Sequence, residues 1–117
     1  MDQGVQLVRD LAQAIPGFDE LLELHMDNER GEILDHVFFW TVTQETVSSF
    51  LGGEETDWRL TLRFLEEQHA RNVHDVTVVI TTSFLLNLPW PGRPGYGLVD
   101  HLGPTMRARF AAVRPSG

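Results

Sequence analysis

The chain has 117 residues, a length that fits one domain with its own hydrophobic core. It contains no cysteine, which excludes disulfides, thiolate metal sites and a cysteine nucleophile. Its 17 acidic residues outnumber nine arginines, lysine is absent, and the net charge of −8 disfavours nucleic acids and anionic membranes as partners.

The first half of the chain predicts two short helices followed by an ambiguous segment. Apolar residues recur at three- and four-residue spacing over residues 5–15, which indicates an amphipathic helix that ends before Pro16. A second helix is predicted over residues 19–28. Residues 37–44 alternate like a strand, but the length of the segment 32–51 favours a helix. Its expected apolar stripe comprises Ile33, Val37, Trp40, Gln44, Val47 and Leu51.

The second half predicts three more helices. The first lies within residues 52–72, with Thr56 as its expected N-cap and an apolar side that begins at Trp58. Residues 73–88 are rich in strand formers, but their apolar spacing of three and four predicts a buried central helix capped by Asp75 or Asn72. The last helix is predicted over residues 104–113, where Pro104 suits the first turn.

These elements predict an all-α single domain over residues 1–117. We expect an irregular bundle of five or six helices, with a short α-solenoid-like stack of antiparallel helix pairs as the alternative. Residues 1–3 and 114–117 are expected to fray. The first residues do not resemble a signal peptide and no apolar run has the length of a membrane span, so we expect a cytoplasmic protein.

The charge is distributed unevenly along the chain. Seven acidic residues lie between Asp19 and Asp35, with only Arg30 as a basic residue among them. This segment is either a solvated helix face or a docking patch for a basic protein partner. As a docking patch, it would use Asp19, Glu20, Glu23 and Asp27.

A metal site is the first chemical candidate. Glu66 and His69 have the Glu-x-x-His spacing that places both side chains on one helical face, as in di-metal bundle sites. Glu32 and His36 offer an opposing pair. A di-metal bundle needs two such motifs and only one is present, so a surface helix with an inward-facing histidine is the competing interpretation, and no cofactor is expected.

No other pattern indicates catalysis. The hydroxyls at residues 81–83 lie in a predicted buried helix, where they usually bond back to the preceding turn. Glu54, Glu55 and Asp57 precede a helix start, where acids stabilise the helix dipole without a catalytic role.

The proline- and glycine-rich segment 89–97 contains Trp90, Arg93 and Tyr96, residue types that dominate binding hot spots. The segment is either a partner-binding loop or a stiff joint between two helices. In a joint, the rings of Trp90 and Tyr96 pack into the helix junction, which is the interpretation we favour.

Four segments carry a resemblance to known proteins: GEILDHVFFW, FLEEQ, SFLLNLPWPG and GYGLVDHLGP. In this order, over roughly residues 31–112, they resemble a family of small, acidic, helical bacterial proteins of largely unassigned function. Such proteins look like the immunity partners found beside bacterial polymorphic toxins. The chain departs from the family at Leu86, where relatives often have an acidic residue.

The resemblance implies a stoichiometric inhibitor without catalytic residues. Together with the acidic charge, it leads us to expect a non-enzymatic protein-binding module, an immunity-type protein that covers a basic toxin domain. The alternatives are a metal-binding bundle that uses the Glu/His cluster and a structural subunit whose role is oligomerisation.

Overall fold

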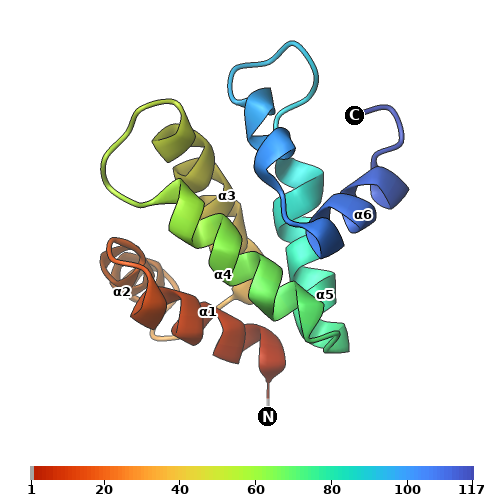
Figure 1. Cartoon of the computed structure of the whole chain (residues 1–117). Coiled ribbons are helices and arrows are strands. Elements are labelled where there is room, and N and C mark those ends of the chain that lie inside the picture. Colours follow the sequence, from red (N-terminus) through yellow and green to blue (C-terminus); the bar gives the residue numbers. More distant parts are fainter. Residues whose placement is uncertain (1) are drawn as a thin grey trace.

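The computed structural model describes residues 2–117, whose arrangement is shown in Figure 1. Within these residues the chain forms six α-helices, one π-helical and two 3-10 segments, and no strand. The all-α fold is therefore confirmed. No helix among residues 2–117 has both the length and the hydropathy needed to cross a membrane.

The first two helices form a hairpin around Pro16. Helix α1 spans Gln3–Ala14, and the side chain of Asp2 caps it by accepting a hydrogen bond from the N–H of Val5 at 3.0 Å. Helix α2 spans Phe18–Asn28. Gly17 forms the turn between them with a φ of +100°, a conformation that glycine adopts without strain.

Helix α3 spans Asp35–Phe50, so residues 37–44 are helical. The expected apolar stripe was wrong, because Val37, Trp40 and Leu51 are exposed. The buried face instead comprises Phe38, Phe39, Val42, Thr43, Thr46 and Ser49. Thr43 and Thr46 can face the core because each hydroxyl donates to the carbonyl four residues earlier, at 2.8 and 2.7 Å.

Helix α4 spans Trp58–Ala70, and its N-cap is Asp57 rather than the expected Thr56. The Asp57 carboxylate accepts from the N–H groups of Arg59 and Leu60, whereas Thr56 is buried. Neither Asp75 nor Asn72 caps the next helix, which follows Val73 without a side-chain cap. Asn72 adopts a left-handed conformation just after α4, with a φ of +58°.

The central rod, residues 74–87, joins α5 (His74–Val79), the π-helical η1 (Ile80–Phe84) and the 3-10 segment η2 (Leu85–Asn87). It is the buried central element that the apolar spacing predicts. The Ser83 carbonyl accepts hydrogen bonds from the side chains of Thr43 and Asn87 at 2.9 and 3.0 Å. Thr82 bonds back to Val78 as expected, at 2.8 Å.

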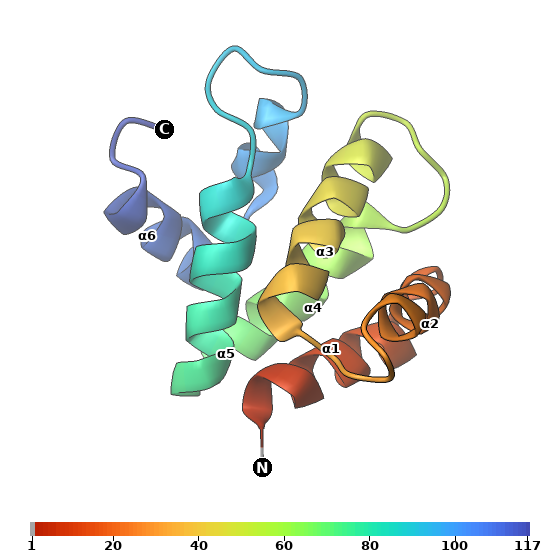
Figure 2. The same cartoon turned by 180° about the vertical axis from the view of Figure 1, so that it is seen from behind.

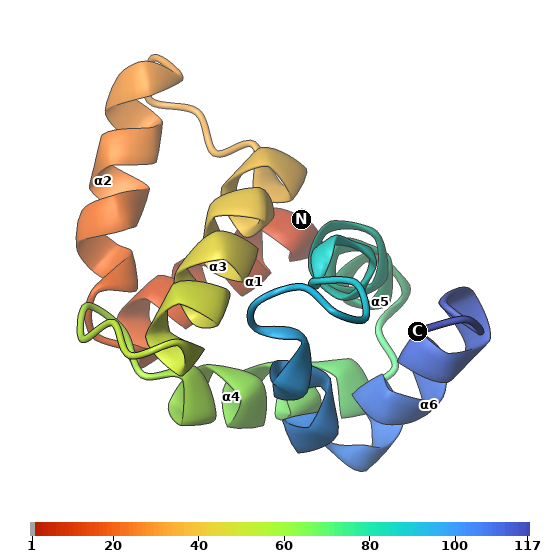
Figure 3. The same cartoon turned by 90° about the horizontal axis from the view of Figure 1, so that it is seen from above.

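After the loop, the 3-10 segment η3 (Tyr96–His101) leads to α6 (Pro104–Val113). Seen from above in Figure 3, α2 and α6 lie at opposite ends of the molecule, with α3, α4 and the central rod between them. Figure 2 shows α3 beside the central rod, which it contacts. The helices thus form an irregular bundle.

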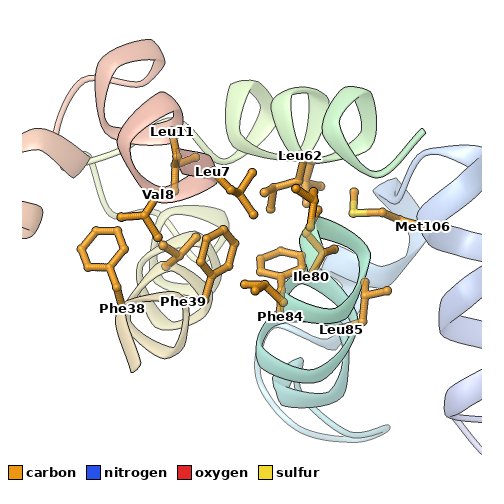
Figure 4. Packing of buried hydrophobic residues seen from close by; sticks show 14 of the residues in the cluster. Leu7, Val8, Leu11, Phe38, Phe39, Leu62, Ile80, Phe84, Leu85 and Met106 are labelled. Carbon is orange, nitrogen blue, oxygen red and sulfur yellow. The ribbon is translucent and has the colours of Figure 1, made fainter. Parts of the chain in front are cut away.

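Side chains from five parts of the chain meet in one core, shown in Figure 4. Leu7, Val8 and Leu11 come from α1, and Phe38 and Phe39 from α3. Leu62 comes from α4 and Met106 from α6, and the central rod supplies Ile80, Phe84 and Leu85.

Two adjacent aromatic residues test which face of α3 is buried. Phe39 is 0% exposed and Trp40 is 57% exposed. We expect Phe39→Ala to lower the free energy of unfolding by about 3–5 kcal/mol because it leaves a core cavity. Trp40→Ala should cost less than about 1 kcal/mol. Urea unfolding measures both values, and a larger loss for Trp40→Ala would contradict the assigned buried face.

Candidate functional site

The acidic face of α2 is exposed as the sequence predicts. Asp19, Glu20, Glu23 and Asp27 are all exposed, and Leu24 among them is 57% exposed. Asp19 also accepts a hydrogen bond from the Gly17 N–H at 3.2 Å. The single ion pair found among residues 2–117 joins Arg107 to Asp100 at 3.9 Å, so these acids have no basic partner there.

A groove runs along α2 beside the 51–57 loop. One part, of about 520 Å³, is lined by Pro16, Gly17, Glu20, Leu21, Leu24 and Glu55. An adjoining part, of about 260 Å³, is lined by Pro16, Glu54, Glu55, Thr56, Asp57 and Leu60. We call this continuous surface the acidic groove. Its lining combines the apolar side chains of Pro16, Leu21, Leu24 and Leu60 with four carboxylates.

Gly17 allows the two sides of the acidic groove to meet. A Cβ atom at this position would collide with the Glu55 carbonyl oxygen and would contact the Thr56 methyl carbon at 3.0 Å. The absence of a side chain therefore lets the 51–57 loop approach the start of α2. Glu55 joins the α2 acids only through this contact, which the sequence pattern does not reveal.

A second carboxylate lies next to Glu55. Burial raises the pKa of Glu45 on α3, and the charge of Glu55 and a hydrogen bond with it raise the pKa further. Both residues line a small cavity of about 60 Å³, together with Ser48, Ser49, Gly53 and Thr56. This pair is not apparent from the sequence because its members lie ten positions apart on a helix and a loop.

An open cleft of about 370 Å³ lies between α4 and η3, on other residues than the acidic groove. The rings of Trp58 and His101 meet edge to face at 4.9 Å, and Arg59 lies 4.3 Å from the Trp58 ring centroid. Arg63 and Glu67 also line it. The mixture of both charges around an aromatic wall does not indicate one class of ligand.

The four predicted metal candidates do not come together. Glu66 and His69 face α6, whereas the His36 ring contacts Ser83 and Thr82 of η1, and Glu32 is exposed. Among residues 2–117, no group of three or more histidine or acidic side chains has the geometry to hold a metal ion. The four candidates therefore do not form one cluster, and His69 is buried, as the competing interpretation of an inward-facing histidine expects.

Glu66 instead caps α6 from a different helix. Its two carboxylate oxygens accept from the N–H groups of Thr105 and Met106, each at 3.0 Å. Gly103 makes this possible, because a Cβ there would lie 2.5–2.7 Å from Glu66 atoms. Burial opposes ionisation of Glu66, but these hydrogen bonds outweigh it, and the pKa of Glu66 is lowered.

His69 supports the same junction. Its Nδ1 lies 2.9 Å from the Thr105 hydroxyl, and its Nε2 is buried without a hydrogen-bond partner. Burial and the charge of Arg109 lower the pKa of His69, although Glu66 acts in the opposite direction. A neutral imidazole is therefore favoured in the folded protein.

A contact between His36 Nδ1 and the Ser83 hydroxyl is also not apparent from the sequence, because 47 positions separate the two residues. A serine–histidine pair is one part of a hydrolytic triad. Ser83 is buried, however, and within residues 2–117 no carboxylate hydrogen-bonds to the His36 ring. The pair therefore lacks the group that would orient the histidine.

The 89–97 loop is tied to the end of α6 by Arg114. The guanidinium donates to the carbonyl oxygens of Leu85, Leu88 and Pro89 at 3.2, 2.7 and 2.9 Å, and to Gly117 at 2.6 Å. Arg114 is 3% exposed, so the expected fraying of residues 114–117 is not what the structure shows. Arg114 is held in place because its positively charged side chain binds carbonyl oxygens at the C-terminal end of the central rod, where the helix dipole favours a cation.

The three loop residues named by the sequence lie in different environments. Trp90 is 53% exposed and its ring lies 3.9 Å from the Arg114 guanidinium carbon. Tyr96 is half-buried against the core, and Arg93 is exposed. Tyr96 therefore packs into the junction as expected, whereas the Trp90 ring stays more than half exposed and contacts Arg114, and Arg93 is exposed.

No protein-family model, curated protein or solved structure matches this chain. The resemblance to immunity proteins stays a prediction.

Replacing Glu66 tests the cap of α6. Glu66→Gln keeps one acceptor oxygen but loses the charge, so we expect about 1–2 kcal/mol lower stability at pH 7 by urea unfolding. Glu67→Gln changes an exposed neighbour and should stay within about 0.5 kcal/mol of the wild type.

The stabilisation by Glu66 should also depend on pH. The folded-state pKa of Glu66 lies below its usual 4.5, so its stabilisation is present above pH 4.5 and is lost as the pH falls through the lower folded value. The difference between wild type and Glu66→Gln should therefore shrink below pH 4.5. A difference that stays constant down to pH 2 would contradict the cap.

Arg114 and Trp90 can be compared to test the joint. Arg114→Met leaves three carbonyls at the end of the central rod without their donor, and we expect a loss of at least about 2 kcal/mol. Trp90→Ala removes one partly exposed cation–π contact and should cost about 0.5–1 kcal/mol. Arg93→Met is the matched control and should leave the melting temperature unchanged. Equal effects of Arg93→Met and Arg114→Met would contradict the anchoring role.

Proposed function

We propose that the chain is a non-enzymatic binding protein whose acidic groove docks on a basic surface of a protein partner. The observation that carries the proposal is that the two hollows of the groove adjoin at Pro16 and Glu55 and combine apolar side chains with carboxylates from α2 and the 51–57 loop. Glu20, Glu54, Glu55 and Asp57 form the rim, and all are exposed.

This arrangement suits a protein interface. Apolar contacts at the centre of an interface supply affinity, and a charged rim supplies specificity and speeds association. Leu24 is exposed among the α2 acids and is placed to contact an apolar part of the partner. The unpaired acids do not have to break internal ion pairs before they bind.

A toxin that acts on nucleic acids is the partner class that fits best. Such an enzyme needs a basic surface to hold phosphates, and an acidic protein can cover that surface. The resemblance to immunity proteins of polymorphic toxin systems points to the same class. In this role the chain neutralises its toxin by forming a stoichiometric complex.

Co-expression with the product of the adjacent gene tests the proposal. We expect a one-to-one complex on size exclusion, and protection of cells that would otherwise be killed by that product. The absence of both a complex and protection would overturn the immunity role.

Charge reversal locates the interface. Glu20→Arg with Glu23→Arg should weaken binding of the basic partner at least about tenfold, and the loss should shrink at high salt because the interaction is screened. Glu67→Arg makes the same kind of change on α4, outside the groove, and should change the affinity less than about threefold. Calorimetry at two salt concentrations measures both. An equal loss for the two variants would show a diffuse charge effect and not a docking site.

A further inference from the structure

One side of the molecule exposes apolar side chains with no charged side chain among them. It is formed by α3 and the central rod, which run side by side in the same direction in Figure 2 and contact each other. Eight large apolar side chains are exposed among residues 2–117, and half of them belong to these two elements. We call this surface the neutral face and define it by six exposed residues, Val37, Trp40, Gln44, Val78, Thr82 and Leu86.

The boundary between α3 and the central rod reaches the surface within the neutral face. The His36 ring lies 3.3 Å from the Thr82 hydroxyl and also contacts Ser83. His36 and Thr82 are both exposed. Trp40 lies one turn after His36, and Leu86 lies one turn after Thr82. Because the two elements run in the same direction, the Trp40 ring and the Leu86 side chain stand at the same level, and the face is continuous across both elements.

The neutral face contrasts with the net charge of −8. Neither residues 37–44 of α3 nor residues 76–92 of the rod and the following loop contain an acidic residue or an arginine. The next acid of α3, Glu45, is half-buried and lines the cavity that it shares with Glu55. A basic partner gains no charge attraction at this face. A second copy of the chain, which carries the same net charge, meets less repulsion here than at a surface rich in acids.

The side chains of the neutral face are also able to pair with themselves. In a two-fold symmetric dimer, the same surface of both copies meets across the axis. The Gln44 amide contains donors and an acceptor, so two such amides can bond reciprocally, which two carboxylates or two guanidinium groups cannot do. Trp40 is 57% exposed and supplies the large ring that often concentrates the binding energy of an interface.

The size of the neutral face indicates a reversible contact. Two neighbouring helices present a surface roughly 20 Å wide, and the 16 residues of α3 extend about 24 Å. The resulting footprint of roughly 500 Å² is below the roughly 800 Å² that each partner contributes to a standard interface. A contact of this size is typical of weak complexes, so its Kd should be in the micromolar range.

We propose that the neutral face is the contact surface of a weak two-fold symmetric dimer of this chain. The two copies pack α3 and the central rod against each other, and the Trp40 ring of each copy contacts apolar side chains of the other. The dimer does not depend on the proposed function, because the neutral face shares no residue with the lining of the acidic groove.

Sedimentation equilibrium of the full chain at neutral pH, from about 5 to about 500 µM, tests the dimer. We expect a monomer–dimer equilibrium whose Kd falls at least about threefold between about 0.05 and about 0.5 M NaCl, because salt screens the repulsion between two copies of charge −8. A chain that stays monomeric over the whole range at both salt concentrations would overturn the proposal.

Two substitutions locate the contact. Trp40 and Leu24 are each 57% exposed, and replacing either with glutamate adds one negative charge, but Leu24 lies on α2, outside the neutral face. Trp40→Glu should weaken self-association at least about tenfold, and Leu24→Glu less than about threefold. Trp40→Ala adds no charge and should still weaken it at least about threefold. Equal losses for the two glutamate variants, or a larger loss for Leu24→Glu, would reject the neutral face as the contact.

The outcomes separate the dimer from the proposed function. Self-association should strengthen with salt, whereas binding of a basic partner to the acidic groove should weaken with salt. A monomeric chain that still binds a basic partner would reject the dimer alone, and a dimeric chain that binds no basic partner would reject the docking role alone. A monomeric chain that binds phosphatidylcholine vesicles, and loses this binding in Trp40→Glu, would overturn the dimer and assign the face to a lipid surface.

Discussion

Two charged side chains withdrawn from water are each neutralised by main-chain groups and not by an opposite charge. The Glu66 carboxylate meets the N–H groups that begin α6, and the Arg114 guanidinium meets the carbonyls that end the central rod. Helix ends carry partial charges of the required sign at these places. The two contacts fix both ends of α6 against the rest of the bundle.

This use of helix ends leaves the large acidic excess unpaired. Without Glu66 and Arg114 the chain still has 16 acidic residues against eight arginines, an excess of eight, and surface ion pairs contribute little to the fold. Stability therefore rests on the apolar core around Phe39 and Phe84. The α2 acids are free to serve recognition because the fold does not depend on their pairing.

The sequence predicts the helices well and their contacts poorly. The bounds of α2 and α6 agree with the expected ranges to within one residue, because apolar spacing and the Pro16 and Pro104 signals are local. The prediction of the buried face of α3 was wrong because Thr43 and Thr46 are polar, yet their hydroxyls bond to carbonyls of their own helix and can face the core. The partners of Glu66, His69 and Arg114 lie 25 or more residues away, apart from Gly117, and local patterns do not encode them.

The candidate site shows the same division. The acids of α2 are predictable from one segment, and all four named residues are exposed. Their extension into a groove depends on Gly17 meeting the 51–57 loop, and the Glu45–Glu55 pair depends on how that loop returns to α3. Both features are tertiary, so only the structure assembles them.

The central claim is that the acidic groove is a binding surface. Hydrogen–deuterium exchange on the chain, free and saturated with its basic partner, tests this most directly. The account predicts new protection concentrated in residues 16–28 and 51–57, with α6 unchanged. Protection confined to the cleft between α4 and η3, or to the 89–97 loop, would contradict it.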